Sequence, residues 1–467
     1  MININKKLNL IKLVLVTIVD AGFFYFGTEY WLFSWVALTL ASVYALKANL
    51  KRSFFVGSMA YFLGNSNPQN VLPIFVYGTW IFLNAIAFGG ILLSFKMAAD
   101  RWKCWKAIFV FATGITGYEY IISLLSPHGT VSSIAYTQTN NLIIIQIASL
   151  VGIWGITFIM TMVAANAAVL IEYKSFRNIK QNLLMSSIVM FAIIFGLYRL
   201  YMPVEEDYVK VGAGAVSSNL QQYLVVAENK DPQKVGELIQ RYIEQIDDLA
   251  KAGADYVVLP EKIITITSES DLKKIYEAAR RKNIYVIVGV SNRDGAGWKN
   301  TAYVVSNGGE KILQYDKHHL QTTFEKKYIE GNHIGVFENK GVEICKDMDF
   351  TWPSVEYSKQ GVGVVFVPAL DFHDDAWSHA RVAIVRGVEG NFSVVRAAQW
   401  GLLSVSDNRG RVLSKLSTDA AADDAKILAQ VPVAAGNSIY SKIGDIFAWV
   451  CIISFVNGCI ELLKKYK

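Results

Sequence analysis

The sequence predicts an α-helical membrane bundle of about eight transmembrane helices joined to a globular α/β domain. Three observations support this fold class. The chain of 467 residues is 53% hydrophobic, with a mean hydropathy of +0.30, which is too apolar for an ordinary soluble enzyme. Long apolar runs fill its first part. A polar stretch with alternating strand-like and helix-like segments follows, and a last apolar run comes before the C-terminal lysines.

Seven apolar runs precede residue 204, each near the ~20 residues that a helix needs to cross a bilayer. They are Leu8–Gly27, Trp31–Leu46, Phe54–Gly64, Val71–Phe95, Ala107–Leu125, Leu142–Ile171 and Leu184–Tyr201. The first lacks the small-residue cleavage site of a signal peptide, so we interpret it as a retained anchor. An eighth run spans Ile443–Leu463. The predicted domains are a seven-helix bundle at 1–203, a globular domain at 204–438 and a C-terminal transmembrane helix at 439–467.

Basic residues fall in alternate loops, and Lys and Arg accumulate on the cytoplasmic side of membrane proteins. The basic residues are Lys6, Lys7, Lys47, Lys51, Arg52, Lys96, Arg101, Lys103, Lys106, Lys174, Arg177, Lys180 and the C-terminal lysines. The loops Ser66–Asn70 and Ser126–Asn141 carry none. This pattern favours keeping the short third run as a span. It places the globular domain on the extracytoplasmic side of a cell (inner) membrane. The net charge of +6, without a long basic run, argues against a nucleic-acid partner.

The polar stretch has the pattern of an α/β domain. Short apolar runs at Tyr256–Leu259, Ile284–Val290 and Val362–Val367 have the length of buried strands. The segment Val235–Lys251 has the apolar spacing of an amphipathic helix. Strands that alternate with helices predict a layered domain with catalytic groups at the strand ends.

Three reactive side chains follow strand-like pieces of this domain: Glu261, Lys317 and Cys345. Taken singly, each has a structural explanation, since a lone cysteine is usually a core residue and the two charges are usually solvated. Together they supply what attack on an acyl carbon needs. A thiol with an unperturbed pKa of ~8.5 requires a base or a cation beside it at neutral pH. Glu261 can be the base, and Lys317 can stabilise the thiolate and the later oxyanion.

The order of these pieces resembles the nitrilase, or carbon-nitrogen hydrolase, superfamily. The pieces Arg386-Gly387-Val388-Glu389 and Arg396-Ala397 also resemble the superfamily's pattern after the cysteine strand. The resemblance implies an α-β-β-α sandwich with a Glu-Lys-Cys triad. Glu325 occupies the place of a further active-site glutamate; its alternative is one charge in an exposed loop.

The membrane part resembles apolipoprotein N-acyltransferase. The resemblance lies in Tyr136-Thr137-Gln138, in the run from Gln146 to Gly155, and in Gly444-Asp445 with Phe447-Ala448-Trp449. It implies that Cys345 takes an acyl chain from a membrane phospholipid as a thioester. The acceptor would be the N-terminal amine of a diacylated lipoprotein. The reaction would need no metal and no organic cofactor.

Departures from the family pattern keep other functions open. Lys346 and Asp347 replace the usual Tyr-Glu after the cysteine, and Gln321-Thr322-Thr323-Phe324 precedes Glu325 where the family has Val-Pro-Phe-Gly. Early in the domain only Ser217-Ser218-Asn219 is left of an expected motif, with no tryptophan after it. One alternative is a membrane-anchored amidase or nitrilase that gives the thioester to water. Another is an inactive lipid-binding or scaffolding protein, which the intact set of four site residues argues against.

Three polar side chains lie in or near the predicted spans: Asp20, Asn84 and Glu119. Ionisable groups in a membrane are costly and often functional. Glu119 also has a parallel in the family. Packing and function are equally good explanations of these residues from the sequence.

Overall fold

The computed structural model describes residues 4–66, 74–102, 105–173, 179–201, 207–217, 231–294, 297–373, 375–418 and 424–464. It divides into two compact units. Unit 1 comprises Met1–Leu125, Ser132–Leu200 and Gly444–Lys467, and unit 2 comprises Ser126–Val131 and Tyr201–Ile443. The domain boundaries 203/204 and 438/439 stay a prediction. Part of the early motif, Ser218 and Asn219, lies outside the described residues.

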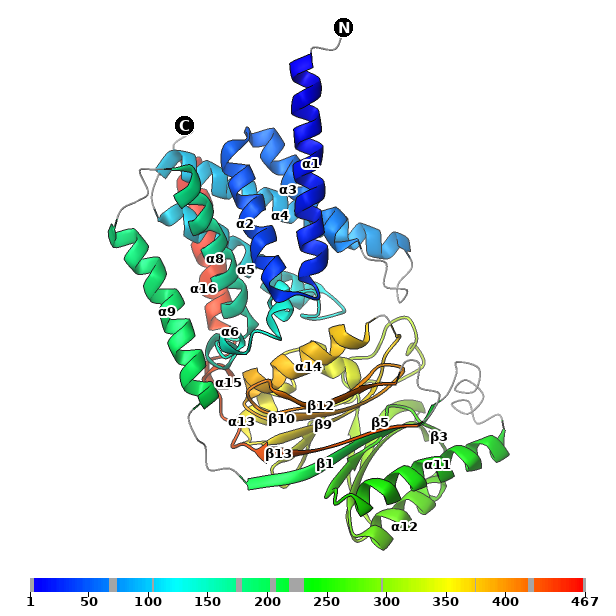
Figure 1. Cartoon of the computed structure of the whole chain (residues 1–467). Coiled ribbons are helices and arrows are strands. Elements are labelled where there is room, and N and C mark those ends of the chain that lie inside the picture. The colour runs from blue at the N-terminus through cyan, green and yellow to red at the C-terminus, as the bar shows by residue number, and fades with distance from the viewer. Residues whose placement is uncertain are drawn as a thin grey trace. The chain divides into compact units, whose positions relative to one another are not determined.

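Unit 1 is helical (Figure 1). Its long helices are α1 (Ile4–Gly27), α2 (Trp31–Lys47), α3 (Leu50–Asn65), α4 (Ile74–Trp102), α5 (Lys106–Leu125), α8 (Ile153–Glu172), α9 (Ile179–Tyr201) and α16 (Ile446–Leu463). Within the described residues, five stretches are long and apolar enough to cross a membrane: Gly78–Trp102, Lys106–Leu125, Ile153–Glu172, Asn182–Tyr201 and Ile446–Leu463. A membrane part is therefore supported, while the number of eight crossings stays a prediction.

The predicted single span Leu142–Ile171 is wrong as one continuous helix. The chain forms two short helices, α6 (Leu142–Ile145) and α7 (Ala148–Val151), before α8 begins at Ile153. Gly152 separates α7 from α8 with a φ of +71°. That backbone conformation is open to glycine and interrupts a right-handed helix. The apolar composition predicted the segment's burial but not this break.

Two glycines of α5 let α16 approach closely. A Cβ atom on Gly114 would lie 2.8 Å from a ring carbon of Phe455. A Cβ atom on Gly117 would lie 3.3 Å from the backbone of Ile452. Small residues at helix contacts are a common packing device in membrane proteins.

The two membrane motifs of the sequence meet within unit 1. The indole Nε1 of Trp154 donates a hydrogen bond to Oδ1 of Asp445 at 2.7 Å. The ring of Tyr120 packs edge-on against both Trp154 and Trp449, with centroids 5.1 and 5.4 Å away. These contacts fix the start of α16 against α5 and α8.

Glu119 is held by donors from its own unit. Its carboxylate accepts hydrogen bonds from the hydroxyls of Ser133 and Thr157, both at 2.7 Å, and from the backbone N–H of Ile134 at 2.9 Å. A buried carboxylate with three donors has a structural explanation. Asp20 differs, because neither of its buried oxygens has a hydrogen-bond partner among the described residues.

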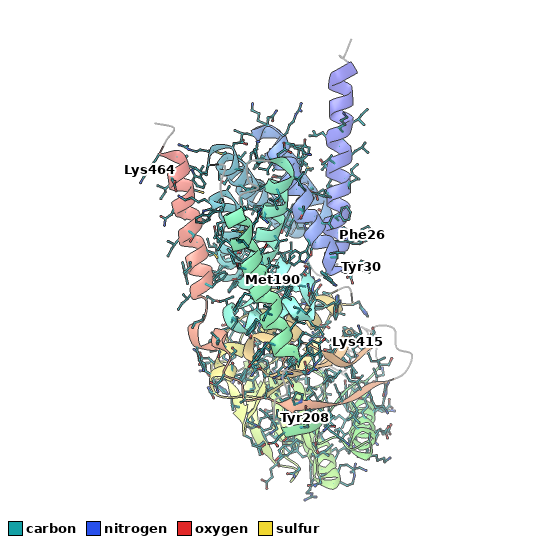
Figure 2. All side chains as sticks on the ribbon, turned by 60° about the vertical axis from the view of Figure 1, so that its left-hand side comes forward. Phe26, Tyr30, Met190, Tyr208, Lys415 and Lys464 are labelled. Carbon is teal, nitrogen blue, oxygen red and sulfur yellow. The ribbon has the colours of Figure 1, made fainter. Side chains whose placement is uncertain are left out.

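The outward faces of α9 and α16 are apolar. Figure 2 shows α9 with Met190, which is 50% exposed, and α16 leading to Lys464. Phe191, Ile194 and Ile453 are 58 to 59% exposed on the same two helices. Faces of this kind are unfavourable in water, so they suit contact with lipid.

Unit 2 contains two sheets. The first has the order β13-β1-β2-β4-β5-β6, with β3 pairing with β4, and the second has the order β12-β11-β10-β9-β8-β7. The first consists of β1 (Asp207–Ala215), β2 (Tyr256–Val258), β3 (Thr265–Ile266), β4 (Tyr285–Asp294), β5 (Gly297–Val305), β6 (Lys311–Asp316) and β13 (Ala425–Val433). The second consists of β7 (Gly335–Phe337), β8 (Lys340–Val342), β9 (Val364–Leu370), β10 (Ser393–Gln399), β11 (Leu402–Ser406) and β12 (Val412–Ser417).

The sheets and helices of unit 2 form four layers, so the α-β-β-α sandwich is confirmed. Side chains from both sheets, including Val258, Ile287, Phe366 and Val395, share one buried core. The helices α11 (Pro232–Lys251) and α12 (Lys273–Lys282) cover the other face of the first sheet through a second core. The helices α13 (Ser354–Lys359) and α14 (Ala376–Gly390) cover the second sheet. Figure 1 shows α14 on one side and α11 with α12 on the other.

The first and last strands of unit 2 are neighbours. β1 pairs antiparallel with β13 from Asp207 opposite Val433 to Ala215 opposite Ala425. The pair lies at one edge of the first sheet, where the chain enters and leaves the domain.

Candidate active site

Three strand ends bring the predicted reactive residues to one place in unit 2. Glu261 follows β2, Lys317 follows β6, and Cys345 begins the short 3₁₀ helix η4 (Cys345–Asp349) after β8. Cys345 has a φ of +45°, a conformation that costs a non-glycine residue energy. Strain of this kind is often found at nucleophiles held on a sharp turn between elements.

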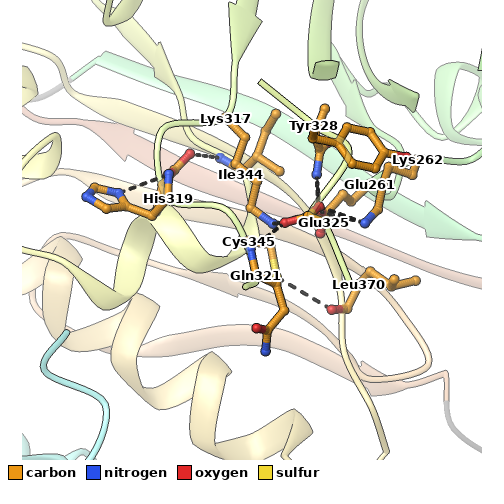
Figure 3. Close-up of polar contacts among 12 residues, drawn as sticks. Glu261, Lys262, Lys317, His319, Gln321, Glu325, Tyr328, Ile344, Cys345 and Leu370 are labelled. Atoms are coloured by element: carbon orange, nitrogen blue, oxygen red, sulfur yellow. Dashed lines mark hydrogen bonds and ion pairs between the residues drawn. The ribbon is translucent and has the colours of Figure 1, made fainter. Parts of the chain in front are cut away.

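Lys317 lies between two carboxylates. Its Nζ is 2.8 Å from Oε1 of Glu261 and 3.0 Å from Oε2 of Glu325. Figure 3 shows these groups together with Cys345. Only 1 to 2% of each of these three residues is exposed, so their charges act on one another with little screening. The Glu325 side chain is therefore buried in this cluster, although its loop neighbours Phe324 and Lys326 are exposed.

Lys262 and Asn300 complete this network, and sequence reasoning missed both. The Nζ of Lys262 is 2.7 Å from Oε1 of Glu325 and 3.8 Å from Oε1 of Glu261. The amide Nδ2 of Asn300, on β5, donates to the same two carboxylates at 2.5 and 2.6 Å. Asn300 has no distinct signal in the sequence, because it stands between the polar residues Lys299 and Thr301 of β5. The signal for Lys262 was its position directly after Glu261.

The network fixes the charge of its members. Burial alone would lower the pKa of Lys317, but the carboxylates of Glu261 and Glu325 outweigh it and hold this pKa well above its usual range. Burial alone would raise the pKa of Glu325, but the ammonium groups of Lys317 and Lys262 hold it well below its usual range. Lys317 is therefore a cation and Glu325 an anion at neutral pH.

The thiol of Cys345 is protonated at rest. Burial raises its pKa well above the usual range, Glu261 adds to the effect, and Lys317 opposes it. In the part of the chain that the structure describes, its one hydrogen bond runs from Sγ to the carbonyl oxygen of Leu370 at 3.5 Å. The charges of Glu261 and Lys317 thus reach the sulfur without a direct hydrogen bond to it. Activation of this thiol requires removal of its proton.

Buried side chains around the site form hydrogen-bonded pairs. The guanidinium of Arg396 forms two hydrogen bonds with Asp371, one of them from Nη1 to Oδ2 at 2.8 Å. Asp347 accepts from the Tyr315 hydroxyl at 2.7 Å and from the His319 backbone N–H at 2.8 Å. Arg396 and Asp347 belong to the motifs of the sequence analysis, and both are held by buried hydrogen bonds.

Two family models match successive parts of the chain. Residues 21–166 match the apolipoprotein N-acyltransferase N-terminal domain, and residues 217–442 match the carbon-nitrogen hydrolase family. An apolipoprotein N-acyltransferase from Geobacter metallireducens is 25% identical over 383 residues, covering 72% of this chain and 70% of that protein. The chain is similar to apolipoprotein N-acyltransferases along most of its length. Apolipoprotein N-acyltransferase 1 from Treponema denticola is 21% identical over 521 residues, covering 93% of this chain and 92% of that protein.

This similarity draws on both units. The carbon-nitrogen hydrolase match contains Glu261, Lys317, Glu325 and Cys345. The chain also resembles a deaminated glutathione amidase from Synechocystis sp., which is 27% identical over 198 residues. The amidase match covers 35% of this chain and 72% of that protein. What distinguishes the apolipoprotein N-acyltransferase family here is the helical part that matches residues 21–166.

Proposed function

We propose that this chain transfers an acyl chain from a membrane phospholipid, through a thioester on Cys345, to the N-terminal amine of a diacylglyceryl lipoprotein. The observation that carries the proposal is the buried network of Glu261, Lys317 and Glu325 beside the strained cysteine. Lipoprotein N-acylation agrees with the family. The donor, the thioester and the role of each residue are the proposed part.

In the first step Glu261 takes the proton of Cys345 Sγ, and the thiolate attacks the carbonyl carbon of the phospholipid ester. The oxyanion that forms is stabilised by the ammonium of Lys317 and the backbone N–H of Lys346. The carbonyl re-forms as the bond to the glycerol oxygen breaks. That oxygen takes the proton from Glu261, and lysophospholipid leaves.

In the second step the amine of the acceptor attacks the thioester carbonyl. Such an amine has an unperturbed pKa of ~7.7 to 8.0, so much of it is neutral near physiological pH. Glu261 takes the amine's proton as the new C–N bond forms. The C–S bond then breaks, and the proton returns to the sulfur.

Glu325 acts here as a positioning residue. Its carboxylate binds Lys317 on one oxygen and Lys262 on the other. It thereby keeps the Lys317 ammonium charged and directed between Glu261 and the oxyanion. No metal or organic cofactor enters either step.

We propose further that the chain crosses the inner membrane several times and keeps unit 2 outside the cytoplasm. The alternation of Lys and Arg between the loops and the five apolar stretches support this topology. Reporter fusions at the 47–52 and 126–141 loops would test it. Active alkaline phosphatase at 47–52 would contradict the topology.

The decisive experiment uses the purified full chain, a phospholipid and a synthetic diacylated lipopeptide. Mass spectrometry should show one added amide-linked acyl chain on the lipopeptide. It should also show an acyl adduct on Cys345 when the acceptor is omitted. Cys345→Ala should form neither product while eluting from gel filtration like the wild type. Transfer at the wild-type rate by this variant would refute the nucleophile assignment.

The alternative function is a membrane-anchored carbon-nitrogen hydrolase. The similarity to the Synechocystis amidase favours it, together with the match of residues 217–442 to the carbon-nitrogen hydrolase family. In the same experiment a hydrolase would release free fatty acid and leave the lipopeptide unchanged.

A further inference from the structure

Lys346 is a buried lysine directly after the proposed nucleophile. It directly follows Cys345 in η4 (Cys345–Asp349) and is 5% exposed. Its Nζ is buried and forms no hydrogen bond with any described residue. A buried charge is costly unless an opposite charge or a hydrogen bond compensates it. The side chain therefore has the properties of a group that completes its contacts with a ligand.

The carboxylates near Lys346 are engaged elsewhere. Asp349 lies 3.2 Å from Nδ1 of His379, which also pairs with Asp375 at 3.3 Å. Asp347 is bound by Tyr315 and by the His319 backbone. Glu325, the next carboxylate whose charge reaches Lys346, binds Lys262 and Lys317 as described above. Among the described residues, none of these carboxylates forms a hydrogen bond with the Lys346 ammonium.

Both acidic and basic groups surround Lys346. Burial lowers the pKa of Lys346, Asp349 opposes this effect, and Lys317 adds to it. An anion that entered the site would reverse this balance, since it would interact with Lys346 and Lys317 together. The position thus favours an anionic ligand over a neutral or cationic one.

We propose that Lys346 binds the phosphate of the phospholipid acyl donor while the donor's ester carbonyl lies at Cys345. This inference rests on the proposed function and names the feature by which the donor is recognised. In a glycerophospholipid only the glycerol carbons separate the ester from the phosphate. The Lys346 side chain starts from a Cα atom ~3.8 Å from that of Cys345. This long side chain can therefore span a distance similar to that between the ester and the phosphate.

This assignment explains a departure from the family pattern. The family usually has tyrosine after its cysteine, whereas this chain has Lys346. A tyrosine hydroxyl offers a neutral hydrogen bond, but an ammonium offers a charge-assisted one to phosphate. The Lys346 side chain discriminates acyl donors by charge. The backbone N–H of Lys346 still donates a hydrogen bond to the oxyanion.

The test compares two acyl donors on the full-length protein in detergent. One is dipalmitoyl phosphatidylglycerol, and the other is para-nitrophenyl palmitate, which delivers the same acyl chain without a phosphate. The rate of thioester formation on Cys345 is measured by mass spectrometry for wild type, Lys346→Met, Lys346→Gln and Lys346→Arg. Lys326→Met removes an exposed lysine and is the matched control. Each variant is used as its monodisperse gel-filtration fraction, so both donors meet the same folded protein.

Lys346→Met and Lys346→Gln should slow acylation by the phospholipid about tenfold or more, because a charge-assisted contact is lost. Their rate with para-nitrophenyl palmitate should fall far less than their phospholipid rate, because the backbone N–H at position 346 is kept. Lys346→Arg should keep most of the phospholipid rate. Equal slowing with both donors would overturn the inference, because Lys346 would then act at the carbonyl or on the structure. Wild-type rates with both donors would overturn it as well. A wild-type protein that forms no thioester with either donor would instead remove the proposed function, and this inference with it.

Discussion

Lys262 donates a hydrogen bond to Glu325 across 2.7 Å, so the two residues form a buried ion pair within the site. The pair leaves the second oxygen of Glu325 for Lys317, which lies 3.0 Å from it. Glu325 is thus held by Lys262 on one oxygen while it orients Lys317 with the other. In the proposed mechanism Lys317 contacts the substrate, whereas Glu325 and Lys262 position Lys317.

Lys262→Met should lower kcat for lipopeptide acylation about tenfold and leave KM almost unchanged. The reason is that Glu325 would lose one of its two cations and hold Lys317 less firmly. Steady-state kinetics would show the split. The control is Lys326→Met, because Lys326 is exposed in the same loop. An unchanged kcat in Lys262→Met would mean that Asn300 and Lys317 suffice to fix Glu325.

Glu343→Gln should flatten the pH dependence of stability. Burial raises the pKa of Glu343 from an ordinary 4.5 to about 8, and Asp347 adds to the effect. The folded protein therefore binds this proton more tightly than the unfolded chain does. Stability from this group is complete below pH 4.5 and is lost as the pH rises to about 8. Melting curves in detergent between these two pH values should fall more steeply for wild type, and parallel curves would contradict the assignment.

Arg396→Lys should destabilise the chain by about 2 kcal/mol or more, because a lysine cannot reproduce the paired hydrogen bonds with Asp371. Thermal unfolding followed by circular dichroism would report the loss as a lower Tm. Arg411→Lys is the matched control. Arg411 is paired with Asp407 at 2.6 Å but its side chain is 47% exposed, so its replacement should change Tm little. Equal effects of the two substitutions would count against a special role for the buried pair.

Gly117→Leu should weaken the packing of α16 on α5, because even a Cβ atom at this position would press on the Ile452 backbone. We expect a Tm lowered by about 5 °C or more in detergent. Gly90→Leu is the control, since a Cβ atom at Gly90 on α4 would meet no atom within 4 Å. A Tm equal to that of Gly90→Leu would show that the contact tolerates bulk.

Local sequence patterns predicted much of unit 2. The predicted strand runs Tyr256–Leu259, Ile284–Val290 and Val362–Val367 overlap β2, β4 and β9. The end of the Val235–Lys251 helix was also right, although Pro232 begins it three residues earlier. Elements with a strong apolar period are fixed by short-range properties, so one sequence is enough to find them.

Long-range placement limited the prediction of the site. The reactive residues were found because each follows a strand and because their order resembles a known family. Lys262 was missed because its role depends on Glu325, which is 63 positions further along the chain. The positive φ of Cys345 and the break at Gly152 likewise have no periodic signature. Such features arise from packing between distant segments, which composition and spacing do not reveal.

The pairing of β1 with β13 means that unit 2 begins and ends on adjacent strands. Neighbouring strands are ~4.8 Å apart, so the two ends of the segment 207–433 lie close together. Only a small separation between the flanking residues is needed to accommodate this segment. A catalytic domain with such closely spaced ends can be inserted into a loop without moving the flanking helices apart. This geometry explains in physical terms how an enzyme can be interposed within a succession of apolar segments.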